Sequence, residues 1–107
     1  MSAVEAVRVA TTEAPLRLAV FISGSGSGMQ ALLHHQGSKP CLHETTLVVS
    51  NIAGVAGLGK AEAHNVNTVT IELDQSISDR IKRREAHERD IMTVMEEHGI
   101  EVVILSG

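Results

Sequence analysis

Short apolar runs alternate with longer mixed segments along most of the chain. Four runs rich in Val, Ile, Leu and Thr predict β-strands, at residues 17–22, 45–50, 66–73 and 102–105. The segments between them favour helices, over 28–35, 58–64 and from Ser76 or Ser78 to about His98. Apolar strands separated by helices are typical of a parallel sheet that is covered on both faces. The pattern therefore predicts an α/β fold, a Rossmann-like doubly wound sheet of about four parallel strands with flanking helices.

Local signals place several boundaries within this pattern. Turn residues predict a loop over 36–40, with His43 also in a loop, and we expect Asn65 as the C-cap of the second helix and Gly99 just after the third. The strand over 66–73 is the least apolar, which indicates a position near a sheet edge. The third helix is expected to turn inward Ile81, Ile91, Val94 and Met95, and to expose Lys82, Arg83, Glu85, Glu88 and Arg89.

The first fourteen residues differ from the rest of the chain. Residues 1–14 lack sustained periodicity, and Pro15 marks their end. They carry neither the basic bias of a mitochondrial presequence nor the apolar core of a signal peptide. We expect a flexible extension over 1–14, which plays no part in the fold, and one domain over 15–107.

Composition excludes several partners. The chain of 107 residues has a net charge of −4, so no basic surface is expected for nucleic acid or an anionic membrane. No stretch approaches the roughly 18 apolar residues of a membrane span. The single cysteine, Cys41, fits a reducing compartment, and we expect a cytoplasmic protein. Phe21 is the only aromatic residue, so the chain cannot build an aromatic stacking site alone.

The strongest chemical signal follows the first predicted strand. There the sequence reads Gly-Ser-Gly-Ser-Gly over residues 24–28 and then enters a helix-forming stretch. Glycines allow the backbone to approach a ligand, and a helix N-terminus offers N–H groups and partial positive charge to an anion. The segment predicts a site for a monophosphate. The alternative is a tight strand-to-helix turn that needs glycine only for its backbone angles.

Two related motifs do not fit this segment. In a dinucleotide fingerprint counted from Gly24 and Gly26, the third glycine would stand at Met29. No carboxylate follows the second strand, where such a fingerprint places its ribose-binding acid. The Walker pattern also fails, because no Gly-Lys-Ser/Thr follows the loop.

Other candidate groups favour structural roles. Six histidines are scattered over loops and separate helices, where the adjacent His34 and His35 point in different directions. One cysteine cannot complete a Cys/His zinc cage, so no metal site is expected and the histidines are assigned to solvation or capping. A ligand role for His87 is the less favoured alternative. Ser23 lacks the Gly-x-Ser-x-Gly elbow of a nucleophile.

Several ordered motifs resemble a known family. Residues 22–31 read Ile-Ser-Gly-Ser-Gly-Ser-Gly-Met-Gln-Ala, where that family shows Ile-Ser-Gly-x-Gly-Ser-Asn-Leu-Gln-Ala. The chain ends in Val-Val-Ile-Leu-Ser-Gly, where the family reads Asp-Val-Val-Val-Leu-Ala-Gly. Further matches are Val-Ser-Asn at 49–51, Ala-Gly-Leu at 56–58 with Lys-Ala at 60–61, and Arg-Glu-Ala-His-Glu-Arg-Asp at 84–90. From Leu18 onward the chain thus resembles the N-terminal half of the phosphoribosylglycinamide formyltransferases of purine synthesis.

The resemblance implies roles for five residues. It assigns the 5′-phosphate of glycinamide ribotide to Gly26, Ser27 and Gly28, and 10-formyltetrahydrofolate to Arg84 and Gly107. Without it, pairing of Arg84 with Glu88 one helical turn on is the favoured interpretation. Gly28 stands where the family has Asn, so a side-chain amide is lost. A hydrogen bond to a charged group contributes roughly 1.5–3 kcal/mol, and phosphate affinity is expected to fall by about tenfold or more.

The resemblance also implies what this chain lacks. The family's catalytic Asn, His and Asp lie beyond the position of Gly107, so no catalytic residue is expected within residues 1–107. We expect the ribotide-binding part of a formyltransferase, inactive without a C-terminal half. The alternatives are a non-catalytic phosphate-binding or assembly module and, less favoured, a formyltetrahydrofolate hydrolase. The fourth strand would form an exposed edge, which predicts self-association or pairing with a C-terminal half.

Overall fold

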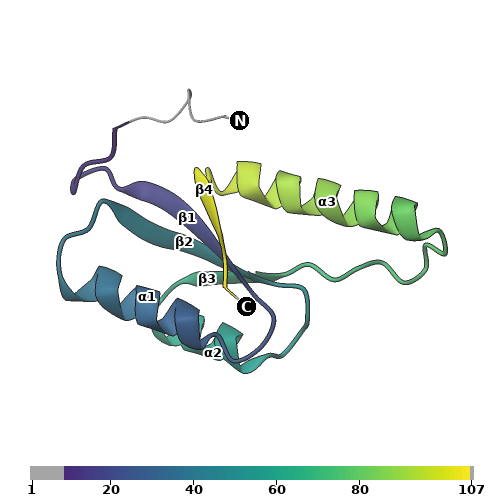
Figure 1. The fold of residues 1–107 in the computed structure, drawn as a ribbon, viewed down its shortest axis with the longest axis horizontal. Helices are drawn as coiled ribbons and strands as arrows, with labels where there is room; N and C mark the ends of the chain where they lie inside the picture. The colour runs from purple at the N-terminus through teal and green to yellow at the C-terminus, as the bar shows by residue number, and fades with distance from the viewer. Residues whose placement is uncertain (1–8, 107) are drawn as a thin grey trace.

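Strands and helices alternate along the chain in its computed structural model, which describes residues 9–106 (Figure 1). The elements are β1 (Leu16–Ile22), α1 (Ser27–Ser38), β2 (His43–Ser50), α2 (Ala56–Ala63), β3 (Asn67–Thr70), α3 (Arg80–Glu97) and β4 (Val102–Leu105). Residues 9–15 precede β1 and belong to no helix or strand. The role expected for residues 1–14 stays a prediction, since residues 1–8 lie outside the described part.

The four strands form one parallel sheet in the order β3-β2-β1-β4. Val20 of β1 lies at the centre, paired with Val48 of β2 on one side and Ile104 of β4 on the other. Both Val20 and Val48 are fully buried, as expected for strands that are covered on each face. The predicted α/β fold with four parallel strands is confirmed, and so is the edge position of the third strand.

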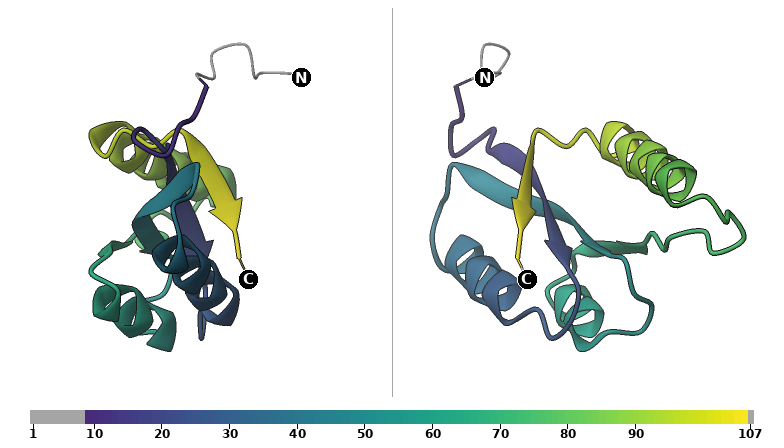
Figure 2. Two further views of the ribbon diagram at one scale, coloured as in Figure 1. Left: turned by 90° about the vertical axis from the view of Figure 1, so that its left-hand side faces the viewer. Right: turned by 45° about the vertical axis from the view of Figure 1, so that its right-hand side comes forward.

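Helices cover both faces of the sheet. In Figures 1 and 2, α1 and α2 lie against one face and α3 lies against the other. The first face holds a core of the buried residues Val20, Ile22, Met29, Leu33, Val48 and Ala61. The second holds Ala19, Leu47, Val49 and Ile71, with half-buried side chains of α3 packed on them. The doubly wound arrangement thus follows from strands that present apolar side chains alternately to two helical layers.

Several predicted boundaries were wrong. Helix α1 runs through Ser38, so residues 36–38 are not in the predicted loop. The Gln36 side chain explains this, because its oxygen accepts from the Thr45 N–H (3.1 Å) and hydroxyl (2.7 Å), while its nitrogen lies 2.8 Å from Nδ1 of His43. These bonds hold the last turn of α1 against β2, which already includes His43. Strand β3 covers only residues 67–70, since its partner β2 ends at Ser50, whose carbonyl accepts the Ile71 N–H.

The start of α3 also differs from expectation. Asp79, not Ser76 or Ser78, caps the helix, and its Oδ1 accepts from the N–H groups of Ile81 (2.9 Å) and Lys82 (3.1 Å). Ile81 is 72% exposed and does not belong to the apolar side, which Ile91, Val94 and Met95 do form.

Three smaller expectations have mixed outcomes. The Arg83 side chain is half-buried and not solvated, because its Nε donates to the Ile77 carbonyl at 2.9 Å. Gly99 follows α3 with φ of +63°, as expected. Asn65 closes α2 with φ of +61°, one residue beyond the C-cap His64. The predicted C-cap was therefore wrong by one residue, because His64 ends the helix and Asn65 takes the left-handed conformation that follows it.

Arg17 at the start of β1 ties the sheet to the end of α3. Its Nη2 donates to the His98 carbonyl (2.6 Å) and its Nε to the Gly99 carbonyl (3.1 Å). Its backbone N–H donates to the Glu101 carboxylate at 3.0 Å, and the Glu101 N–H returns a bond to the Arg17 carbonyl. A cation at the C-terminal end of a helix stabilises carbonyls that have no intrahelical donor.

Candidate functional site

The glycine-rich segment forms a turn between β1 and α1. Gly26 is the residue before the helix, with φ of +70° and ψ of +29°, and its carbonyl accepts the first helical hydrogen bond, from the Gln30 N–H at 2.8 Å. Among the described residues, no side chain caps this end of α1, and its first turn contains no acidic group. The N–H groups of Ser27, Gly28 and Met29 are therefore free of intrahelical partners and available to an anion.

Gly26 is required at its position for two reasons. Its positive φ disfavours any other residue, and a Cβ there would lie 2.9 Å from the Cα of Gly57. Gly57, in the first turn of α2, is equally confined, since its Cβ would lie 2.5 Å from Cδ1 of Ile22 and 3.0 Å from the Gly24 carbonyl oxygen. The Gly57 N–H donates to that same oxygen at 3.1 Å. The turn is thus held in shape by α2, a role for Gly57 that the sequence motif alone did not indicate.

A small hollow of about 190 Å³ opens at this turn. It is lined by Gly24, Ser25, Gly26, Ser27, Gly28 and Ser106. The structure therefore brings together the three residues expected to bind phosphate, and it adds Ser106 from the end of β4. The hollow lies at the carboxyl ends of parallel strands, where ligands of such sheets bind.

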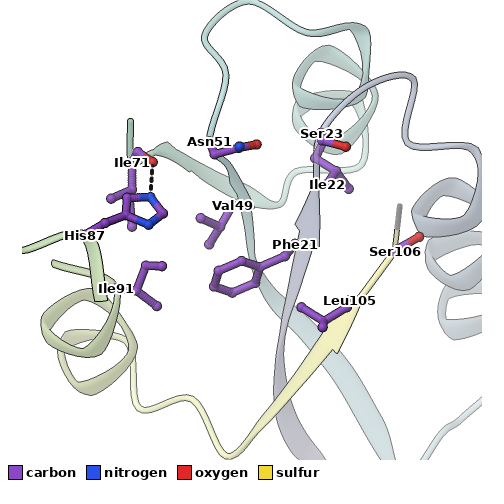
Figure 3. A pocket seen from close by; sticks show the side chains of 10 residues that line it. All are labelled: Phe21, Ile22, Ser23, Val49, Asn51, Ile71, His87, Ile91, Leu105 and Ser106. Carbon is purple, nitrogen blue, oxygen red and sulfur yellow. Dashed lines mark hydrogen bonds between the residues drawn. The ribbon is translucent and has the colours of Figure 1, made fainter. Parts of the chain in front are cut away.

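A second, mostly apolar cavity of about 290 Å³ lies between the sheet and α3 (Figure 3). Its lining comes from the ends of all four strands and from α3, and comprises Phe21, Ile22, Ser23, Val49, Asn51, Ile71, His87, Ile91, Leu105 and Ser106. Leu105 is 81% exposed, so the β4 side of the cavity is open. The lone aromatic residue, Phe21, thus belongs to the wall of a cavity, as Figure 3 shows.

Two polar groups shape this cavity from the β2 and β3 side. His87 Nε2 lies 2.7 Å from the Ile71 carbonyl oxygen, a hydrogen bond that connects α3 to the end of β3. The fully buried Ser50 donates its hydroxyl to the Ile52 carbonyl (2.6 Å) and accepts from the Ile52 N–H (3.0 Å). That tight turn directs Asn51 toward the cavity (Figure 3). The half-buried His87 is therefore neither solvated nor a helix cap, contrary to the expectation for the histidines.

The other histidines mostly meet one another. His34 of α1 contacts His64 edge-on with ring centroids 5.2 Å apart, and His35 stacks on His43 at 6.3 Å. His34 and His35 are exposed and His64 is the C-cap residue of α2, as expected for solvated or capping histidines. His98 caps α3, also as expected, with Nδ1 3.0 Å from the Val94 carbonyl oxygen. Within residues 9–106, no three metal-ligating side chains gather at one place.

Of the two residues expected to bind folate, Arg84 lines a different hollow from the one at the glycine turn. Arg84 is exposed and, with Asp79, Arg80, Ile81 and Glu85, lines a surface hollow of about 540 Å³ at the start of α3. In the described part of the chain it makes no ion pair with Glu88. Gly107, the other expected folate residue, lies outside the described residues. No helix in residues 9–106 is long and apolar enough to span a membrane.

The sheet order, the two helical layers and the glycine turn that opens α1 define an α/β protein of the doubly wound class. The chain belongs to the formyl transferase family, whose model matches residues 16–107. This family assignment agrees with the resemblance found in the motifs.

Curated relatives and solved structures agree with that assignment. The trifunctional purine biosynthetic protein adenosine-3 of Bos taurus is 38% identical over 91 residues, which are 85% of this chain and 8% of the relative; the human protein is 37% identical over a similar span. A phosphoribosylglycinamide formyltransferase structure from Brucella melitensis matches with TM-score 0.77 and 30% identity, over 87% of this chain and 46% of that one. A formyltetrahydrofolate deformylase from Pseudomonas putida matches with TM-score 0.69 and 26% identity, over 85% of this chain and 30% of that one. The chain thus spans less than half the length of these proteins.

Proposed function

We propose that this chain is the N-terminal, ribotide-phosphate-binding part of a folate-dependent phosphoribosylglycinamide formyltransferase. The observation that carries the proposal is the hollow at the glycine turn, on which the N-terminal N–H groups of α1 open. Family membership and the names of the relatives supply the substrate, glycinamide ribotide, and the reaction, formyl transfer. The formyl donor in this proposal is 10-formyltetrahydrofolate.

The phosphate site consists mainly of backbone. A phosphate dianion in the hollow accepts hydrogen bonds from the N–H groups of Ser27, Gly28 and Met29 and is stabilised by the positive end of the helix dipole. Because Gly57 holds the turn against α2, the N–H groups are oriented before the ligand arrives. A preorganised turn loses less conformational entropy on binding than a free Gly-Ser-Gly-Ser-Gly segment would.

The proposed site for the cosubstrate, 10-formyltetrahydrofolate, is separate from the phosphate site. Arg84, with its exposed guanidinium, contacts the formyl-tetrahydrofolate, and Gly107 borders the ring pocket. Formyl transfer to an amine further needs an acid/base group and donors that stabilise the tetrahedral oxyanion. In the resembling family these groups follow the position of Gly107, so a polypeptide segment carrying them completes the enzyme.

Binding and turnover are tested separately. Titration of the isotope-labelled chain with glycinamide ribotide should shift the amide NMR signals of Gly26 and Gly28, while an equal concentration of glycinamide riboside, which lacks the phosphate, should not. Arg84→Ala should leave these shifts unchanged and weaken binding of 10-formyltetrahydrofolate. Unmoved amides in a well-folded sample would refute the phosphate site.

Turnover needs the complementing segment. Mixing the chain with a C-terminal polypeptide that carries the family's Asn, His and Asp should produce formyl transfer from 10-formyltetrahydrofolate to the ribotide. Ribotide binding without any recovered transfer would instead support a non-catalytic phosphate-binding module. A deformylase would instead hydrolyse the formyl group of 10-formyltetrahydrofolate to formate and tetrahydrofolate and would not act on the ribotide.

A further inference from the structure

Ser106 occupies the boundary between the two cavities. It directly follows β4 and lines both the hollow at the glycine turn and the apolar cavity beside α3. Its backbone N–H donates to the Phe21 carbonyl at 2.9 Å, so its position is set by the sheet. In Figure 3 its side chain lies on the α1 side of β4, away from Ile91 and His87.

The Ser106 hydroxyl lies directly against Gly28. A Cβ placed on Gly28 would come within 2.8 Å of the Ser106 Oγ, closer than real Cβ atoms approach an oxygen. Within residues 9–106 this hydroxyl makes no hydrogen bond to the protein. Gly28 therefore leaves room for a hydroxyl that is free to bond with a ligand in the hollow.

We infer that the Ser106 hydroxyl donates a hydrogen bond to the bound phosphate and so replaces the side-chain donor that Gly28 lacks. This inference rests on the proposed phosphate site. Gly28 and Ser106 then form a matched pair, in which the residue at 28 decides whether the hydroxyl at 106 can reach the ligand. A serine hydroxyl can donate to a phosphate oxygen, and a bond to a charged group is stronger than one between neutral groups.

The sequence motifs agree with this pairing. The family pattern quoted above has Asn at the position of Gly28 and Ala at the position of Ser106. The chain departs from the pattern at both positions, and the fold brings these two departures into contact. Each sequence thus has one side-chain donor at this contact. In the family pattern it is the Asn at the start of α1, and in this chain it is Ser106 after β4.

A double-mutant cycle tests the inference, with ribose 5-phosphate as the probe and calorimetric Kd as the measurement. In the unchanged chain, Ser106→Ala should weaken binding by about tenfold, because one charge-assisted hydrogen bond is lost. Gly28→Asn alone should also weaken binding, since its Cβ lies against the Ser106 Oγ and neither the hydroxyl nor the new amide is then placed to reach the phosphate. Ser106→Ala added to Gly28→Asn should restore binding rather than weaken it further, which is the sign of coupling between contacting residues.

Controls separate this inference from the proposed function. Ser38→Ala removes a hydroxyl at the far end of α1, where it donates to the His35 carbonyl, and should change the Kd by less than about twofold because it lies outside the hollow. If the unchanged chain binds no ribose 5-phosphate, the proposed phosphate site itself is wrong. If the chain binds but Ser106→Ala binds equally well, or the two substitutions are additive, only the role of Ser106 is refuted. Should Ser106→Ala fail to fold, the comparison of Gly28→Asn with the double variant decides.

Discussion

The two faces of the sheet are packed to different degrees. On the α1 and α2 face, Met29 and Ala61 are fully buried against the strands, whereas no residue of α3 is buried on the other face. The cavity of about 290 Å³ lies on the α3 face. A close-packed face can hold a ligand-binding turn in one shape, and a loosely packed face leaves space for a ligand or a further segment. The difference suggests that α1 and α2 supply most of the rigidity and α3 most of the accessible apolar surface.

The largest difference between the two faces is expected in the free energy of unfolding when one apolar side chain on each face is truncated. Met29→Ala creates a void in the packed core and should lower the free energy of unfolding by about 2–5 kcal/mol. Ile91→Ala, at the wall of an existing cavity, should lower it by only about 1 kcal/mol, because the side chain is already half-exposed. Urea unfolding followed by circular dichroism measures both. Equal losses would show that the two faces contribute alike.

A methyl group at the contact between α2 and the glycine turn should have the next largest effect. Gly57→Ala places a Cβ against Ile22 and the Gly24 carbonyl, so it should lower stability by about 1–3 kcal/mol and abolish binding at the turn. Gly59→Ala is the matched control on the same helix, since nothing lies within 4 Å of its Cβ. It should raise stability by up to about 1 kcal/mol through helix propensity. Unfolding curves and ribose 5-phosphate titration of both variants compare the two positions.

A substitution on the open side of the α3 face should affect self-association of the chain more than its free energy of unfolding. The chain is expected to self-associate through β4, an edge strand among the described residues, whose last residue, Leu105, is exposed. Leu105→Lys should suppress association while changing the free energy of unfolding by less than about 0.5 kcal/mol. Sedimentation velocity over a range of concentrations tests this. A monomeric unchanged chain at high concentration would contradict the expectation.

The smallest effect on stability is expected from a substitution in the segment that precedes α3, where Asp74 and Ser76 are hydrogen-bonded. Hydrogen bonds from the Ser76 side chain and then from its backbone N–H lower the pKa of Asp74 below the ordinary value. Since the folded-state pKa is the lower one, the stabilisation is present above the unfolded-state pKa and is lost as the pH falls through the folded-state value. Ser76→Ala should raise the pKa of Asp74 toward its ordinary value, as an NMR titration of the carboxyl carbon would show. An unchanged pKa would mean that the backbone bond alone accounts for the shift.

Local pattern was sufficient for the features that depend on neighbouring residues. The apolar runs predicted the four strands, and the alternation with helices predicted their parallel pairing. Glycine preferences identified the turn before α1 and the left-handed residue Gly99, because a positive φ strongly favours glycine. The weak third strand was correctly assigned to an edge.

Contacts between distant segments could not be predicted in this way. The helical ending of α1 depends on bonds from Gln36 to β2, and the role of Gly57 depends on its contact with the turn after β1. Likewise, Gly28 and Ser106 are separated by 78 positions, from 28 to 106, and meet only because β4 pairs with β1. Ile81 looked like part of an apolar helix side, but it lies in the first turn of α3, where it is exposed.

The bonds from Arg17 have a consequence for how α3 can move. They anchor the carboxyl end of the helix to β1, while the His87 bond to Ile71 is the side-chain hydrogen bond that joins the described helix body to the strand ends. Because His87 lies three residues from Arg84, a tilt of α3 about Arg17 would first break the His87 bond to Ile71. Only then would the Arg84 guanidinium move, while the glycine turn on the opposite layer stays in place.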